Sequence, residues 1–203
     1  MTKIKICGLK TMRDIDYINE LMPDYVGLVF ADSKRKVSLE QAITMRISIK
    51  NNIKVVGVFL DEDREKVLDT AKKLRLDVIQ LHGEEDLEYM EYLKMKSEAE
   101  IWKAVCIKCQ KDLEKIREYE GYKLLLDGAS AGQGKCFDWS LVENKVCGNI
   151  ILAGGINCNN VQHGIYMFKP FAVDVSSAVE TEGIKDYIKM KEFIGKVRQY
   201  DKR

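Results

Sequence analysis

The sequence predicts an α/β protein built as a single (β/α)8 barrel with a parallel eight-stranded core. Three observations lead to this prediction. Eight short apolar runs rich in β-branched residues recur along the chain, with starts about 20–30 residues apart. Charged segments with helical spacing of apolar residues lie between these runs. The chain length of 203 residues fits a barrel near the lower end of the usual size, about 200 residues.

Each apolar run is predicted to be a strand, because near-continuous apolar character is typical of parallel strands buried on both faces. In chain order the runs are KIKIC (3–7), YVGLVF (25–30), KVVGVFL (54–60), DVIQLH (77–82), EIWKAV (100–105), KLLLD (123–127), NIILAGG (149–155) and FAVDVSS (171–177). A doubly wound open sheet has the same alternation of strands and helices, so the strand count leaves closure of the sheet open.

The segments between the runs are predicted to be amphipathic helices, as at 12–22, 63–74 and 111–120, where apolar residues recur at helical spacing. Two helix starts carry capping-box patterns. These patterns are Thr11-x-x-Asp14 and Ser38-x-x-Gln41. An asparagine within INCNN (156–160) is expected to open the helix after the seventh run.

Composition excludes several classes of protein. Lys and Arg number 33, Asp and Glu 32, and the net charge is +1, so no broad basic face is available for nucleic acid. No run approaches the ~18 apolar residues of a membrane span. The N-terminus MTKIKICGLKT lacks the apolar core of a signal peptide, so a cytoplasmic protein is expected. With two prolines and no linker, residues 1–203 are expected to form one catalytic domain.

The cysteines are predicted to be reduced thiols, because they are scattered along a chain without a secretion signal. They stand at positions 7, 106, 109, 136, 147 and 158. Cys106 and Cys109 form a CxxC, but no second pair and no nearby histidine complete a tetrahedral zinc site. We therefore expect no metal there and give this pair a structural interpretation.

Residues unusual for a buried strand concentrate where the predicted strands end, which is where barrels of this kind place their active sites. They are Cys7, Arg35, Gln80, His82, Asp127, Gly154, Gly155, Asp174, Ser176 and Ser177. A glycine pair lets backbone N–H groups approach an anion, and barrels frequently bind phosphate after strands seven and eight. The sequence therefore predicts a phosphate site at Gly154–Gly155 and Ser176–Ser177.

Cys7 and Asp127 form a candidate acid–base pair. A carboxyl group at a barrel mouth can serve as a general acid, and a thiolate as a base. The alternatives are a small buried hydrophobic residue for Cys7 and a capping carboxylate for Asp127. A basic clamp on a substrate carboxylate is expected within 34–36, where the residues alone do not choose among Lys34, Arg35 and Lys36. His82 is either a ligand or a core imidazole.

Seven segments together resemble phosphoribosylanthranilate isomerase of tryptophan biosynthesis. They are KICGLKT, GLVFADSKRKVS, VVGVFLDE, IQLHGEED, LLLDG with GQGKCFDW, LAGGINCNNV, and VDVSSAVE with GIKD. These segments occur in the family's order from Lys3 to about Phe193.

The resemblance implies a (β/α)8 barrel, no cofactor, and an Amadori rearrangement of N-(5-phosphoribosyl)anthranilate. By position it makes Cys7 the general base, Asp127 the general acid and Arg35 the partner of the anthranilate carboxylate. It places His82 against the substrate and Asp174 near the sugar hydroxyls. It implies that the phosphate is held by Gly154, Gly155, Ser176 and Ser177. The implied assembly is a monomer or homodimer, with association to other tryptophan-pathway enzymes left open.

The chain departs from the family pattern at three places. Gln133 stands in AGQG (131–134), where the family has Gly-Gly-Thr-Gly. Ala178 replaces the glycine after DVSS, and Cys158 replaces the proline after LAGG-x-Asn. A Cβ at Ala178 is expected to crowd the phosphate or to disfavour a positive φ.

Two other functions remain to be weighed. One is an isomerase or epimerase for a related pentose or histidine-pathway phosphate, which would leave Arg35 without a partner. The other is a non-catalytic barrel that binds a phosphorylated ligand. The presence of Cys7, Arg35 and Asp127 argues against this last reading.

Overall fold

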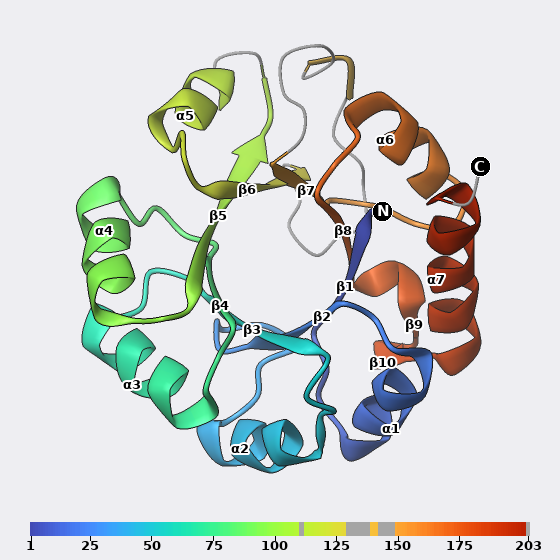
Figure 1. The fold of residues 1–203 in the computed structure, drawn as a ribbon, viewed down its shortest axis with the longest axis horizontal. Helices are drawn as coiled ribbons and strands as arrows, with labels where there is room; N and C mark the ends of the chain where they lie inside the picture. Colours follow the sequence, from blue (N-terminus) through green and yellow to red (C-terminus); the bar gives the residue numbers. More distant parts are fainter. Residues whose placement is uncertain (110–111, 129–138, 142–148, 202–203) are drawn as a thin grey trace. The chain divides into compact units, whose positions relative to one another are not determined.

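The computed structural model describes residues 1–109, 112–128, 139–141 and 149–201. Eight strands are hydrogen-bonded in chain order, β1 to β8, and close into a barrel, which confirms the (β/α)8 prediction over the open sheet (Figure 1). The strands are β1 Lys3–Cys7, β2 Tyr25–Val29, β3 Lys54–Phe59, β4 Val78–Leu81, β5 Glu100–Ile107, β6 Lys123–Gly128, β7 Ile150–Leu152 and β8 Ala172–Val175. Every apolar run predicted to be a strand overlaps one of these strands, and β5 and β6 extend beyond their runs to Ile107 and Gly128.

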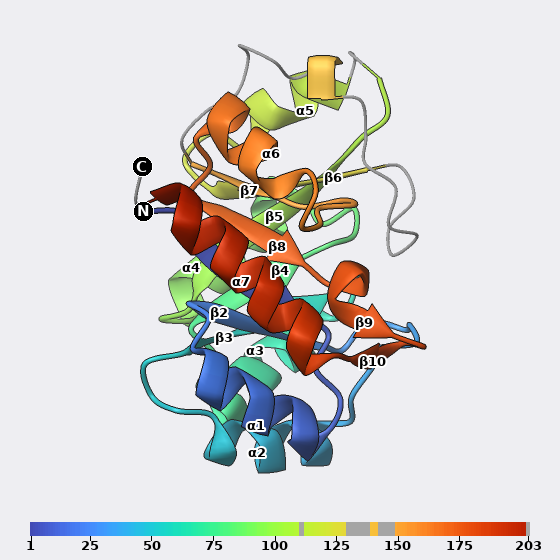
Figure 2. The same ribbon diagram turned by 90° about the vertical axis from the view of Figure 1, so that its right-hand side faces the viewer.

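Helices follow most strands. They are α1 Met12–Leu21, α2 Leu39–Ser48, α3 Arg64–Leu74, α4 Leu87–Lys96, α5 Asp112–Glu118, α6 Val161–Phe168 and α7 Tyr187–Asp201. Two 3₁₀ turns, η1 Trp139–Leu141 and η2 Ser177–Val179, and a small hairpin of β9 Glu180–Thr181 and β10 Ile184–Lys185 complete the described elements. The hairpin lies at the amino-terminal end of α7 (Figure 2).

The chain divides into two compact units, one of residues 7–104 and one of residues 1–6 with 105–203. In the first unit, β2, β3 and β4 pair in parallel, with Val26 opposite Val55 and Val56 opposite Val78. The helices α1 to α4 follow one another along the outer side of these strands (Figure 1). Trp102 is fully buried and lies 5.0 Å from the ring of Tyr25, which closes this core.

In the second unit, β6, β7, β8 and β1 pair in parallel, with Leu125 opposite Ile151 and Leu152 opposite Val173. Gly164 of α6 lets this helix approach β7 closely, because a Cβ there would lie 2.6 Å from Leu152 Cδ2. Large aliphatic residues are fully buried in both units, and each contributes about 1.5–3 kcal/mol.

Side chains cap several helices as the sequence predicts. Both capping boxes are formed, at Thr11 with Asp14 and at Ser38 with Gln41. The N-cap of α6 is Asn160, but its side chain makes no capping hydrogen bond. It accepts instead from the N–H of Asn157, so the expectation of an asparagine opening α6 is correct in position and wrong in the bond it makes.

Three helices end on a residue in the left-handed conformation that is not glycine. Met22 after α1, Arg75 after α3 and Lys169 after α6 have φ values of 54°, 47° and 43°. Glycine usually occupies such positions, because a Cβ is strained there.

None of the helices in the described part of the chain combines the length and apolar character that a membrane span requires.

Candidate active site

Cys7 ends β1, and a glycine of the next strand makes room for it. A Cβ on Gly27 of β2 would lie 2.7 Å from Cys7 Sγ, so only glycine fits beside this sulfur. The thiol is half-buried. The N–H groups of Gly8 and Leu9, immediately after Cys7, donate to Gly27 O at 2.9 and 3.2 Å. The segment carrying Cys7 is thus fixed against β2 by both side-chain packing and backbone hydrogen bonds.

Arg35 lies next to this segment. Gly8 has a φ of +81°, and a Cβ on it would collide with the Arg35 side chain at Cδ. The aliphatic part of Arg35 therefore crosses the backbone of Gly8, one residue from Cys7. Lys34 and Lys36 are exposed, and Lys36 pairs with Asp32 at 3.8 Å on the surface. Of the three basic residues, Arg35 is the one whose stem packs on the segment after Cys7, and its role stays a prediction.

His82 follows β4 and is oriented by Gln80. Gln80 is buried, and its Nε2 lies 3.1 Å from His82 Nδ1. This contact between the Gln80 amide and Nδ1 orients the imidazole ring. The backbone N–H of His82 donates to Phe59 O at 2.8 Å. His82 is thus held through its ring by Gln80 of β4 and through its backbone by Phe59 of β3.

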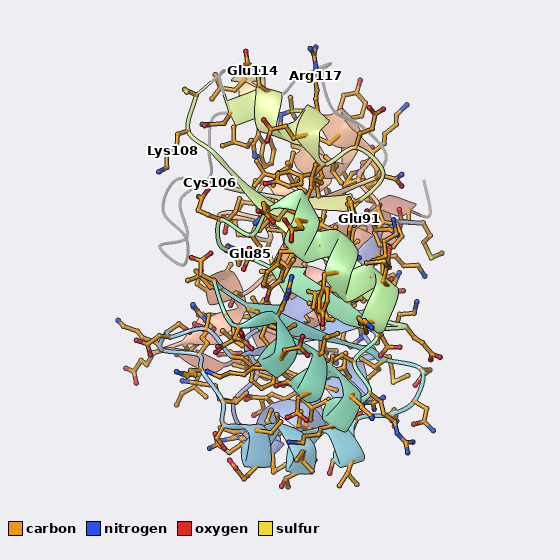
Figure 3. The ribbon with its side chains drawn as sticks, turned by 90° about the vertical axis from the view of Figure 1, so that its left-hand side faces the viewer. Glu85, Glu91, Cys106, Lys108, Glu114 and Arg117 are labelled. Atoms are coloured by element: carbon orange, nitrogen blue, oxygen red, sulfur yellow. The ribbon has the colours of Figure 1, made fainter. Side chains whose placement is uncertain are left out.

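A buried ion pair that sequence reasoning missed supports the loop after His82. Lys103 Nζ lies 2.8 Å from Glu85 Oε2, and both side chains are almost completely buried. Glu85 also accepts from the N–H groups of Asp61 and Gly83, at 2.9 and 3.0 Å. Lys103 donates to Gly83 O as well. Glu85 is labelled in Figure 3, between β4 and α4. One carboxylate thereby joins the segments after β3 and β4 to Lys103 of β5.

Asp127 lies near the end of β6 and faces the glycine pair after β7. Its Oδ1 accepts from the N–H of Gly128 at 2.7 Å. A Cβ on Gly154 would lie 2.6 Å from the same oxygen, so the two loops are in close contact. Cys106 Sγ lies 3.5 Å from Gly128 O. Cys106 and Lys108 are labelled near the carboxyl end of β5 in Figure 3.

The glycine pair has the left-handed conformation that favours glycine. Gly154 and Gly155 have φ values of 64° and 75°. The carbonyl of Gly155 accepts from Nδ2 of Asn157 and Nδ2 of Asn160, both at 3.0 Å. These side-chain amides fix the turn between β7 and α6. The pair lies beyond the end of β7, so its backbone N–H groups belong to a loop rather than to the sheet.

Asp174 and the serines lie at the end of β8. Lys5 of β1 is opposite Asp174 in the sheet register, and its Nζ is 2.8 Å from Asp174 Oδ2. Ser176 precedes η2, and Ser177 begins it. Lys185 Nζ lies 3.0 Å from Ser176 O. The structure therefore adds two buried lysines, Lys5 and Lys185, to the residues that the sequence singled out.

The three residues that depart from the family pattern lie in different surroundings. Ala178 lies inside η2, where the backbone is helical, so the expected strain of a positive φ does not arise. Burial raises the pKa of the Cys158 thiol above its usual value. Gln133 lies outside the described residues, as do Cys136 and Cys147. His163 of α6 stacks on Trp139 with ring centroids 5.7 Å apart.

Comparisons with known proteins decide among the candidate families. The family model for N-(5'-phosphoribosyl)anthranilate isomerase matches residues 4–196. A Clostridium kluyveri protein named N-(5'-phosphoribosyl)anthranilate isomerase is 49 % identical over 199 residues, covering 98 % of each chain. This chain belongs to the N-(5'-phosphoribosyl)anthranilate isomerase family.

Solved structures of phosphoribosylanthranilate isomerases share the fold. The crystal structure from Thermotoga maritima has a TM-score of 0.89 and 35 % sequence identity, covering 98 % of this chain and all of the other. A second structure, an isomerase in complex with reduced 1-(o-carboxyphenylamino)-1-deoxyribulose 5-phosphate, has a TM-score of 0.87 at 35 % identity, with 98 % and 100 % coverage. The Thermotoga maritima isomerase is also described as dimeric.

Family membership decides between an enzyme and a non-catalytic barrel. Members are isomerases and therefore enzymes, so the non-catalytic barrel is excluded as the class of this chain. The roles of individual residues follow from their positions and are argued below.

Proposed function

We propose that this chain converts N-(5'-phosphoribosyl)anthranilate to 1-(2-carboxyphenylamino)-1-deoxyribulose 5-phosphate in tryptophan biosynthesis. The observation that supports this most directly is the accommodation of Cys7. Gly27 makes room for its sulfur, and Gly8 places the stem of Arg35 one residue away. A basic sulfur at the end of β1 and an arginine whose stem crosses the next residue suit a substrate that carries a carboxylate.

The reaction needs one acid and one base. Asp127 protonates the ribose ring oxygen, and the ring opens to an iminium at the anthranilate nitrogen. The positive charge on this nitrogen acidifies the proton on C2. Cys7, as a thiolate, removes that proton to give an enolamine, which then ketonises to the product. Each proton transfer of this kind contributes about 10²–10⁴-fold.

The other residues bind the substrate in this proposal. Arg35 pairs with the anthranilate carboxylate, and His82 contacts the substrate. Asp174 lies near the sugar hydroxyls. The phosphate is bound by backbone N–H groups at the ends of β7 and β8, in the segments Gly154–Gly155 and Ser176–Ser177. The glycine pair supports this role, because a Cβ on Gly154 would lie 2.6 Å from Asp127 Oδ1 and without it the backbone N–H groups are open to an anion. This acid–base chemistry requires neither a metal nor an organic cofactor.

Turnover of freshly generated phosphoribosylanthranilate tests the assignment. Wild-type protein is compared with Cys7→Ala and Asp127→Asn, each expected to lose at least about 10²-fold in kcat. Cys109→Ala and Asp69→Asn, at an exposed thiol and an exposed helical carboxylate, are the matched controls and keep full activity. Full activity in either site variant refutes the role given to that residue.

The proposal also covers the cellular compartment, the domain organisation and the oligomeric state. The chain acts in the cytoplasm as one domain spanning 1–203, as a monomer or homodimer. Cell fractionation, a single cooperative unfolding transition and the mass in solution test these three points. Co-purification with other tryptophan-pathway enzymes tests association.

A further inference from the structure

A buried ammonium lies behind the segment proposed to bind phosphate. The side chain of Lys185 is 1 % exposed, and its Nζ lies 2.7 Å from Glu180 Oε1. The same Nζ is 3.0 Å from Ser176 O and 3.5 Å from Ser176 Oγ. Neither the acid–base chemistry nor the substrate contacts described above make use of Lys185.

A rigid hairpin holds Lys185 in this place. Lys185 of β10 is paired with Glu180 of β9 in antiparallel register. Glu182 and Gly183 connect the strands with φ values of 53° and 78°, as a tight hairpin turn of this hand requires. The N–H of Asp186 donates to Val179 O at 2.9 Å, which ties the hairpin back to η2.

The carbonyl of Ser176 accepts from Lys185 Nζ at 3.0 Å and from the N–H of Val179 at 3.4 Å, and its direction sets that of the next N–H. In a trans peptide, the carbonyl and the following N–H lie in one plane and point in opposite directions. Since the carbonyl of Ser176 points to Lys185, the N–H of Ser177 points to the opposite side of that peptide. A cation on the carbonyl also polarises the peptide and strengthens its N–H as a donor.

The buried ion pair of Lys185 and Glu180 contributes little free energy to folding, which points to a functional role. Burying a lysine with its carboxylate partner contributes little to folding compared with apolar side chains of similar size. An ammonium aimed at a backbone carbonyl is useful where the other end of the peptide binds an anion. We propose that Lys185 is a positioning residue that orients and polarises the Ser176–Ser177 peptide so that its N–H binds the phosphate of the substrate. This inference rests on the proposed function.

The test separates binding from chemistry. KM, kcat and the inhibition constant of inorganic phosphate are measured for wild type and for Lys185→Met. The variant is expected to raise KM and the phosphate inhibition constant by about 10-fold, the effect of a hydrogen bond assisted by charge, and to change kcat by less than about threefold. Lys185→Arg, which keeps the cation, restores most of the affinity for phosphate.

A control on the same hairpin excludes a general effect of lost charge. Lys189 Nζ donates to Glu180 O at 2.8 Å on the exposed side. Lys189→Met is expected to leave KM and phosphate inhibition unchanged. If Lys185→Met behaves like Lys189→Met, or lowers kcat with KM intact, the proposal is wrong.

A double variant separates this role from a structural one and serves if Lys185→Met does not fold. Lys185→Met with Glu180→Leu replaces the whole ion pair by apolar side chains, which preserves folding. Its phosphate inhibition constant is expected to stay about 10-fold above that of wild type. A wild-type value in the folded double variant overturns the inference. Absence of turnover in wild type refutes the proposed function itself, whereas wild-type turnover that phosphate does not inhibit refutes the phosphate assignment and this inference with it.

Discussion

Lys5 Nζ lies 2.8 Å from Asp174 Oδ2, and the lysine side chain is completely buried. The two residues are direct neighbours in the register of β1 and β8. Lys5→Met leaves the carboxylate without this cation, and we expect a loss of about 3–5 kcal/mol in the free energy of unfolding. Denaturant unfolding measures it. The exposed pair of Lys73 and Asp69 is the control, where Lys73→Met is expected to change stability by less than about 1 kcal/mol.

Gly27→Ala tests whether the position of Cys7 is essential. The new Cβ would lie 2.7 Å from Cys7 Sγ and force the sulfur to move. A misplacement of about 1 Å can reduce the rate by about 10²-fold, so a large loss of kcat is expected. Gly195→Ala in α7 is the control, because a Cβ there meets no atom of the described structure within 4 Å. Equal kcat in the two variants would contradict the role of Gly27.

Glu85→Gln tests the buried network behind His82. Replacing this carboxylate leaves the ammonium of Lys103 buried without its partner, and about 3–5 kcal/mol of stability is expected to be lost. Glu91, labelled in Figure 3, pairs with Lys94 at 3.4 Å on the exposed face of α4. Glu91→Gln should change the free energy of unfolding by less than about 1 kcal/mol. Similar values for both substitutions would show that burial of the pair is unimportant.

Acid is expected to weaken the hairpin that carries Lys185. The hydrogen bond from Thr181 Oγ1 is the main cause that lowers the pKa of Asp186 below its usual value. A carboxyl group with a lowered pKa stabilises the folded state above its unfolded pKa, and this contribution disappears as the pH falls through the folded pKa. The stability difference between wild type and Asp186→Asn should therefore shrink below about pH 4. Urea titrations across this range measure it, and a difference independent of pH would contradict it.

The thiols are expected to react in a definite order. Cys106 and Cys109 are exposed, whereas Cys158 is half-buried and desolvation raises its pKa. Since the thiolate is the reactive form, iodoacetamide at neutral pH should modify Cys106 and Cys109 well before Cys158. Peptide mass spectrometry over a time course gives the order, and early modification of Cys158 would rule out this account.

The sequence predicts the strands well because their signal is local. β-branched apolar runs identify each strand, and the capping boxes at Thr11 and Ser38 identify two helix starts. Closure of the sheet is a property of the whole chain, and it required the structure.

Buried lysines could not be predicted for the same reason. Lys5 and Lys103 appear as ordinary charges on strands, and their partners lie 169 and 18 residues away. The register that brings each pair together is fixed only by the complete sheet. The candidate site residues could be named from their strand ends, and Arg35 was chosen among its neighbours by the family resemblance. The packing of its stem on Gly8 is a contact across the loop that only the structure shows.

Stability can still be gained at three left-handed residues, Met22, Arg75 and Lys169. Glycine at each would relieve a strained Cβ and is expected to add about 0.5–1 kcal/mol. In a (β/α)8 barrel, helices end at the face opposite the catalytic loops. Such changes would offset the destabilisation that new substrate specificities often bring, so this barrel is a suitable starting point for directed evolution.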